Sequence, residues 1–147
     1  MNHATPPERG HYALLRADRL GLLIPKDEMG ATEHLSQQPV ASDIPGLLTL
    51  PGHDHTCFLV LSERLQLLDH CPGNRYVTTK MVTEDGTETH WCWTEVRMLI
   101  DFVPRIHPVP EVLLQASSPL RHYAIMDGQP VFLCSAQILQ EVILSRI

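Results

Sequence analysis

The chain has 147 residues, of which 44% are hydrophobic, and its 17 acidic and 11 basic side chains give a formal net charge of −6. A chain of this length can bury one ordinary core or two very small ones. The acidic balance and the lack of a basic cluster argue against a nucleic-acid surface or an anionic membrane, so we expect a protein or small-molecule partner. No apolar run approaches the roughly 20 residues of a membrane span, and the start MNHATPPERG lacks a signal core, so we expect a cytoplasmic location.

The first third of the chain predicts strands after a short tail. Residues 1–10 carry two prolines and no periodicity, which indicates a flexible N-terminal tail. The stretch HYALLRADRLGLLI, residues 11–24, predicts a strand, a turn at Asp18-Arg19 and a second strand. Residues 25–35 then predict a turn followed by either a short helix or an irregular strand, and residues 36–43 a loop.

Residues 44–68, IPGLLTLPGHDHTCFLVLSERLQLL, predict two apolar strands joined by a polar loop and closed by a short helix. Residues 57–61 are apolar without alternation, which indicates burial on both faces of the strand. Ser62 stands where its side-chain oxygen could cap the helix. The turn cluster DHCPGN follows and is the best candidate for a boundary between two halves of the chain.

The second half predicts the same kinds of element. Residues 76–82 and 90–93 predict two strands joined by a turn at Asp85-Gly86. Three prolines between residues 104 and 110 forbid a central strand and favour an extended linker. Pro110 can begin a short helix over EVLLQA.

Residues 119–143, PLRHYAIMDGQPVFLCSAQILQEVI, repeat the order of the 44–68 stretch: strand, turn at Asp127-Gly128, apolar strand, serine, helix. Such self-similarity implies two related structural units. We therefore expect a mainly β fold with short helices near 62–68, 110–116 and 136–146. The units are expected to be subdomains of about residues 11–70 and 75–147 in one domain, with strand exchange between them possible.

Several residues invite a chemical interpretation. The His53-Asp54-His55 loop could offer two imidazoles to a metal, but it supplies no third ligand, and a solvated loop is the simpler interpretation. His70-Cys71 beside Asp69 could pair a base with a nucleophile, but adjacent turn residues rarely converge on one substrate atom. No phosphate-binding loop, dinucleotide fingerprint or hydrolase motif is present, so we expect no catalytic residues, no cofactor and no metal.

The remaining candidates are aromatic, cationic or sulfur-bearing side chains. Trp91 and Trp93 share one face of a strand and could anchor a partner or fill a core. Arg64 could pair across an interface, whereas Arg121 is more simply a surface residue. We expect His90 and His107 to be exposed or capped, without an evident partner. We expect the four cysteines to be reduced and mostly buried, since three lie in apolar runs and none forms a C-x-x-C pair: Cys57, Cys71, Cys92 and Cys134.

Taken in order, these pieces resemble a divergent CheW-like domain, the adaptor module of bacterial chemosensory arrays, of a kind that could serve a twitching-motility or type IV pilus system. The matching stretches, which span roughly residues 12–145, are YALLRADRLGLLI, GLLTLPGHDHTCFLVLSERLQLL, RYVTTKMV with WCWTEV, and PLRHYAIMDGQPVFLCSAQIL. The resemblance implies two related five-stranded SH3-like barrels packed side by side. It also implies a noncatalytic adaptor that bridges a methyl-accepting chemoreceptor tip and the regulatory domain of a histidine kinase.

The resemblance also implies where partners bind. Gly46 and Gly52 stand at glycine positions of the family's first barrel, but Pro51 replaces its arginine. Of the Asp-Leu-Arg that usually ends the next strand, only the arginine survives, as Arg64. The expected partner-binding residues are Gly46, Gly52, Arg64, Trp91 and Trp93. The alternative is a small β-barrel protein that binds a metal ion or small ligand through histidine and cysteine.

Overall fold

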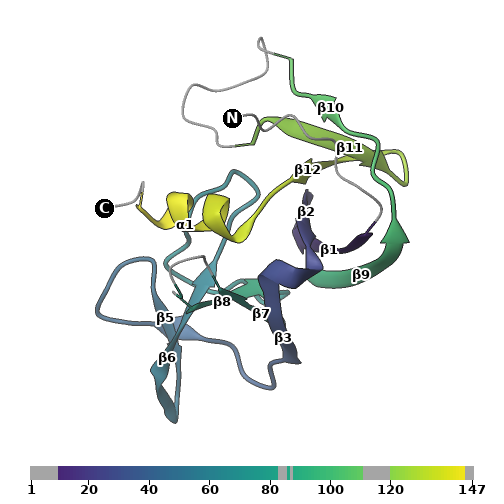
Figure 1. Cartoon of the computed structure of the whole chain (residues 1–147). Helices are drawn as coiled ribbons and strands as arrows, with labels where there is room; N and C mark the ends of the chain where they lie inside the picture. Colours follow the sequence, from purple (N-terminus) through teal and green to yellow (C-terminus); the bar gives the residue numbers. More distant parts are fainter. Residues whose placement is uncertain (1–9, 83–85, 87, 111–119, 145–147) are drawn as a thin grey trace.

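The computed structural model describes residues 10–82, 86, 88–110 and 120–144, and the chain over these ranges is mainly β-structure (Figure 1). Within these ranges, one 3-10 turn, η1 (Lys26–Glu28), and one α-helix, α1 (Ala136–Leu144), interrupt the strands. The strands in the first part are β1 (Gly10–Ala17), β2 (Leu20–Pro25), β3 (Met29–His34), β4 (Val40–Ala41), β5 (Leu48–Leu50) and β6 (His53–Val60). Those in the second part are β7 (Val77–Val82), β8 (Glu88–Trp93), β9 (Glu95–Phe102), β10 (His107–Pro108), β11 (His122–Met126) and β12 (Gln129–Leu133).

These strands form two six-stranded sheets with the same topology. The first sheet has the order β10-β11-β12-β2-β1-β9, and the second, read from its other edge, has the order β4-β5-β6-β8-β7-β3. In each sheet one antiparallel hairpin joins another through a parallel pair, β12 with β2 in the first and β6 with β8 in the second. The matching orders confirm the two related units that the internal repeat predicts. The two-residue strands β4 and β10 add a sixth strand to each expected set of five, and both lie at a sheet edge, where a proline is tolerated.

Each sheet takes strands from both sides of the 69–74 turn. The first sheet combines β1 and β2 with β9–β12, and the second contains β3–β8. The chain therefore leaves the first sheet after β2, builds the second, and returns after β8. Where a subdomain boundary falls within the domain stays a prediction.

Burial on both faces of the central strands explains their unbroken apolar sequences. In β1, Leu15 and Ala17 enter a cluster shared by both sheets and α1, whereas Leu14 enters a second cluster that belongs to the first sheet alone. The shared cluster also holds Leu59, Trp91 and Leu139. The second sheet has its own small cluster, composed of Leu48, Leu50, Phe58, Val60 and Cys92. A strand that faces a core on each side favours apolar residues at successive positions.

The predicted helix at 62–68 is wrong, since this stretch is a tight turn. Ser62 Oγ accepts hydrogen bonds from the backbone N–H groups of Arg64 and Gln66, each at 3.2 Å, and Leu65 has φ 62°. Leu61 and Leu67 form a β-bridge across the turn. The serine oxygen thus satisfies a turn here, as Ser and Thr often do outside helices.

The C-terminal helix is confirmed over 136–144, where Ser135 Oγ accepts a 3.0 Å bond from the N–H of Ile138 as an N-cap. The expected helix at 110–116 lies, apart from Pro110, outside the described residues. After β2 the chain forms the 3-10 turn and then a strand, the second of the two alternatives left open for this stretch. Within the described ranges, no helix has the length and hydropathy needed to cross a membrane.

The four cysteines are free, but their burial differs from the prediction at one position. Cys92 and Cys134 are buried and Cys71 is half-buried, whereas Cys57 is exposed. The apolar run of β6 is therefore buried only from Phe58 onward, because Cys57 precedes the segment that pairs with β8.

Candidate functional site

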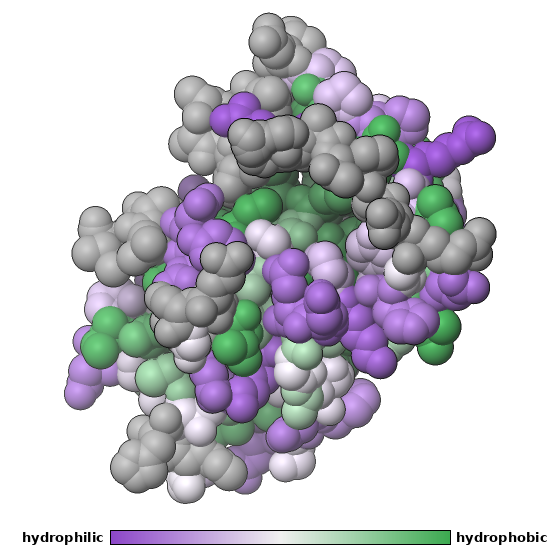
Figure 2. All heavy atoms as spheres, in the orientation of Figure 1, coloured by the Kyte–Doolittle hydropathy of each residue, from purple (hydrophilic) through white to green (hydrophobic). Residues whose placement is uncertain are grey.

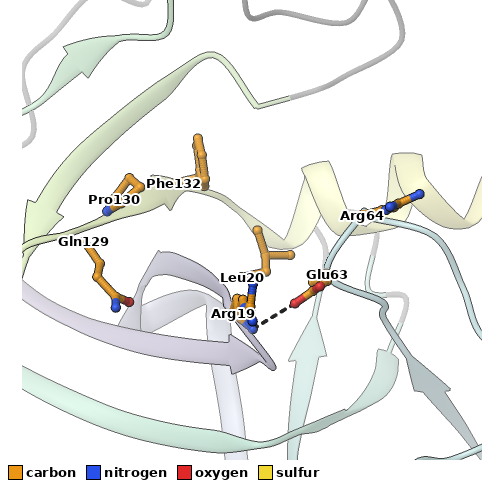
Figure 3. A pocket seen from close by; sticks show the side chains of 7 residues that line it. All are labelled: Arg19, Leu20, Glu63, Arg64, Gln129, Pro130 and Phe132. Atoms are coloured by element: carbon orange, nitrogen blue, oxygen red, sulfur yellow. Dashed lines mark hydrogen bonds between the residues drawn. The ribbon is translucent and has the colours of Figure 1, made fainter.

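A groove of about 470 Å³ lies where the first sheet meets the turn that follows β6 of the second sheet (Figure 3). Three segments line it: Arg19 and Leu20 at the β1–β2 turn, Glu63 and Arg64 in the turn after β6, and Gln129, Pro130 and Phe132 on β12. The two arginines and the glutamate are exposed, and Leu20 is buried. The groove thus combines an apolar surface with exposed charges of both signs.

The tight turn after β6 determines where Glu63 and Arg64 project. Ser62 N donates a 2.8 Å bond to the carbonyl of Gln66, which closes the turn. Glu63 then reaches the opposite sheet, where its Oε2 accepts a 3.1 Å bond from the backbone N–H of Arg19 (Figure 3). In this view Arg64 points away from that bond. The turn that carries Arg64 is therefore held by its own backbone hydrogen bond and by the bond from Arg19 to Glu63. It places the Arg64 side chain on one wall of the groove.

A buried arginine joins the same two segments beneath the groove. Arg75 is 0% exposed, its Nη2 lies 2.9 Å from Asp18 Oδ2, and its Nη1 donates a 2.7 Å bond to the carbonyl of Leu61. Asn74 Nδ2 donates to the other Asp18 oxygen at 2.9 Å. These hydrogen bonds, from Asn74 first and Arg75 second, hold the pKa of the Asp18 carboxyl below its usual value. The β1–β2 turn is thereby fixed against the second sheet.

The structure separates the two glycines that were expected to share a surface. Gly46 has φ 86°, is buried, and lies beside Leu67, next to the turn that carries Arg64. Gly52 has φ 84° and is exposed at the β5–β6 turn, with nothing within 4 Å of an added Cβ. It lies at the other end of β6, whose eight residues span about 26 Å at 3.3 Å each. Gly46 thus lies beside the turn that carries Arg64 but does not line the groove, whereas Gly52 lies elsewhere.

Trp91 and Trp93 are both fully buried in the shared core, with ring centroids 6.2 Å apart in a stacked arrangement. Trp93 Nε1 donates to Thr79 Oγ1 and Trp91 Nε1 to Thr89 Oγ1, each at 2.8 Å. Neither ring is available on the surface. We therefore leave both tryptophans out of the proposed partner-binding site and adopt the core interpretation.

Among the described side chains, the histidines do not gather into a site. Residues 53–55 lie in β6, but their side chains are outside the described part of the structure. Among the described residues, no group of three or more His, Cys, Asp or Glu side chains could hold a metal ion. His90 and His107, expected to have no evident partner, pack against the rings of Phe58 and Tyr123, with centroids 5.8 and 5.3 Å apart.

Sequence reasoning missed Asp18, Arg75 and the β12 wall of the groove. Asp18 and Arg75 are 57 residues apart, and each stands in a turn or beside one, where a charged residue is ordinary. They come together where the β1–β2 turn of the first sheet packs against the segment before β7 of the second sheet. The one signal was an arginine two residues before the start of β7, and it does not identify a partner.

The sequence matches no family model, and no curated protein matches it significantly. Its structure, however, is similar to the crystal structure of scaffolding protein TtCheW from Thermoanaerobacter tengcongensis. The two share 11% sequence identity with a TM-score of 0.60, over 86% of this chain and 88% of the other. The chain therefore has a CheW-like fold.

Proposed function

We propose that this chain is a noncatalytic adaptor of a bacterial chemotaxis-type signalling system, located in the cytoplasm, that bridges a chemoreceptor tip and the regulatory domain of a histidine kinase. The observation that carries the proposal is the CheW-like fold over 86% of the chain, shared with a protein described as a scaffold. The ordered sequence resemblance supports it independently. The net charge of −6 favours protein partners over nucleic acid.

The groove at Arg64 is the proposed binding surface for one partner. Its apolar surface at Leu20 and Phe132 lies beside the exposed cations Arg19 and Arg64. This arrangement fits an amphipathic helix that presents an apolar ridge flanked by acidic side chains. We assign this helix to the receptor tip.

A bridging protein needs two surfaces that can be occupied at once. The β5–β6 turn at Gly52 lies at the far end of β6, about 26 Å from the groove end of the strand. A partner at this turn would leave the groove open. We therefore assign the kinase regulatory domain to the surface around Gly52 and the receptor tip to the groove.

Arg64→Ala tests the groove. The exposed side chain can make a bidentate contact with a carboxylate, so its loss should weaken binding of the receptor tip by about tenfold. The melting temperature should stay nearly unchanged, because no core contact is removed. Titration calorimetry with the receptor tip and the kinase domain separately measures the effect, with Arg121→Ala, an exposed arginine outside the groove, as the control.

Unchanged receptor affinity in Arg64→Ala would remove the groove from the proposed interface. Failure of the wild-type chain to bind either partner would contradict the adaptor role itself. Equal losses in Arg64→Ala and Arg121→Ala would show that overall charge, rather than the groove, determines the affinity.

Gly52→Val tests the second surface. The positive φ of Gly52 disfavours any Cβ by about 1 kcal/mol, so valine should change the turn without causing a clash. We expect weaker kinase binding and unchanged receptor binding. Gly86→Val is the matched control, since Gly86 is exposed with φ 85° and also has nothing within 4 Å. Receptor binding lost together with kinase binding would contradict the assignment of separate surfaces.

A further inference from the structure

We propose that Cys71 and Cys92 form a reversible oxidation site, in which a hydroperoxide oxidises Cys71 and Cys92 then closes a disulfide with it. The inference does not depend on the proposed adaptor role. It rests on two thiols that are separated in sequence, meet in the same small apolar cluster, and differ in their access to solvent.

Cys92 occupies a protected position at the centre of the second sheet. It lies on β8, opposite Thr78 of β7 on one side and Val60 of β6 on the other, and it is fully buried. Cys71 packs against the same small apolar cluster from the 69–74 turn and is half-buried. A small oxidant can therefore reach Cys71 from solvent, whereas it cannot reach Cys92 directly.

The local hydrogen bonds give the two sulfurs different roles. Cys71 Sγ lies 3.6 and 3.8 Å from the carbonyl oxygens of Pro72 and Arg75, to which its thiol form donates. The interaction between the two thiols is the main reason that the pKa of Cys71 is lowered and that of Cys92 is raised. The positive charge of Arg75 further favours a thiolate at Cys71, against the opposing effect of burial. Cys71 is therefore the better nucleophile, and Cys92 is the resolving thiol.

The chemistry balances with one hydroperoxide. The Cys71 thiolate attacks the terminal peroxide oxygen, the O–O bond breaks, and the leaving alkoxide or hydroxide takes up a proton. Cys71 is then a sulfenic acid. The Cys92 sulfur attacks the Cys71 sulfur, the S–O bond breaks, and the departing hydroxide leaves as water with the Cys92 proton. Two thiols lose two electrons and two protons, and the peroxide is reduced to water plus an alcohol or a second water.

The disulfide would restrict the motion of the 69–74 turn, which contains or directly precedes the residues that hold the β1–β2 turn beside the groove. Cys71 precedes Asn74 and Arg75, whose side chains hold Asp18 at the β1–β2 turn. A disulfide from Cys71 to Cys92 on β8 fixes this segment to the centre of the second sheet. It also closes a covalent loop that contains the residues between the two cysteines. Because a cross-link restricts the unfolded chain, the oxidised protein should melt at a higher temperature than the reduced protein.

The experiment treats the folded, reduced full-length chain with hydrogen peroxide, blocks remaining thiols by alkylation, and digests it with trypsin. Each cysteine lies on a different tryptic peptide, with Cys71 on residues 65–75 and Cys92 on residues 81–97. Mass spectrometry should find these two peptides joined, with a loss of two hydrogens, and a thiol reductant should separate them. The rise in melting temperature should disappear with the same reductant.

Two variants separate this site from general thiol oxidation. Cys92→Ala removes the resolving thiol, so a sulfenic-acid probe such as dimedone should accumulate on Cys71 at least several-fold over wild type. Cys57→Ser, which removes the exposed thiol of the same sheet, should leave the 65–75/81–97 linkage unchanged. Linkage seen only after denaturation, linkage of Cys71 mainly to Cys57, or no excess dimedone on Cys71 in Cys92→Ala would each overturn the proposal.

Discussion

At the residue scale, Arg75 is the charged side chain that is buried in the described structure. It is fully buried, so its charge has lost its hydration and depends on the groups around it. Asp18 and the Leu61 carbonyl contact its two terminal nitrogens, while Arg75 Nε has no hydrogen-bond partner in the described structure. Such an ion pair adds little net stability, but removal of one partner leaves a buried charge uncompensated. Its role is to fix the relative position of the two segments that line the groove.

Asp18→Asn should lower the free energy of unfolding by about 1 kcal/mol at pH 7. This loss is smaller than for a fully buried ion pair, because Asp18 is exposed to solvent. Because folding lowers the pKa of Asp18, its contribution is complete above the unfolded value of 3.8 and is lost as the pH falls through the folded pKa. Urea titrations at pH 7 and pH 3 check both points. The difference between wild type and variant should shrink at pH 3.

Asp127→Asn is the control for Asp18→Asn. Asp127 also pairs with an arginine, Arg97, but the pair is exposed at 3.3 Å, and asparagine tolerates the positive φ of this turn. The free energy of unfolding of Asp127→Asn should stay within about 0.5 kcal/mol of the wild-type value. The role assigned to the buried arginine would be contradicted if Asp127→Asn lowered the free energy of unfolding as much as Asp18→Asn. It would also be contradicted if the loss in Asp18→Asn did not change with pH.

At the scale of elements, the parallel contact between β2 and β12 depends on one glycine. A Cβ built on Gly21 would lie 2.9 Å from Val131 Cγ1, and the Val131 side chain is fully buried. The two strands can approach closely only because Gly21 has no side chain. This contact holds the repeated C-terminal hairpin to the N-terminal hairpin, and β12 forms one wall of the groove.

Gly21→Ala should therefore destabilise the fold by about 1–3 kcal/mol through overpacking, although alanine is the better residue for an ordinary strand. Thermal or urea unfolding gives the value. Gly73→Ala is the matched control, because an added Cβ there meets only Gln38 Nε2, at an ordinary 3.7 Å. Equal stability of the two variants would show that β2 and β12 can separate without penalty.

At the scale of the whole molecule, the exchange of strands makes the two halves interdependent. The hairpin β1–β2 pairs with β9 and β12 from the second half, and β7–β8 pairs with β3 and β6 from the first. The shared core draws on both sheets and on α1. A half of the chain by itself would therefore leave parts of two sheets and an apolar core face exposed to water.

Fragments of residues 1–72 and 73–147 should each fail to unfold cooperatively, whereas their mixture should regain native-like structure. Trp91 and Trp93 lie in the second fragment and are fully buried in the intact chain, so their near-UV circular dichroism reports on assembly. The intact chain serves as the reference. Cooperative unfolding of either fragment alone would contradict interdependence and would support subdomains that coincide with the halves.

The sequence by itself determined the repeat and the element types of the paired strands and the last helix, but not the turn at 62–68. The strand–turn–strand at 11–24, the apolar strands near 57–61 and 131–134, the turn at Asp127-Gly128 and the serine cap of the last helix follow from local patterns. The structure contains each of them, with the strand ends shifted by a few residues. The order of these elements also sufficed for the CheW-like fold. Arg64 could be singled out because it stands beside the repeated core.

Only the tertiary structure decided what surrounds these elements. The Ser62 oxygen closes a turn rather than capping a helix because Leu67 packs in the shared core. Local sequence does not reveal this contact. The burial of Trp91 and Trp93 depends on a second layer covering their face of β8. The pairs Asp18 with Arg75 and Cys71 with Cys92 arise where distant segments pack together. Contacts over such separations result from the whole fold, because no local propensity brings those side chains into reach.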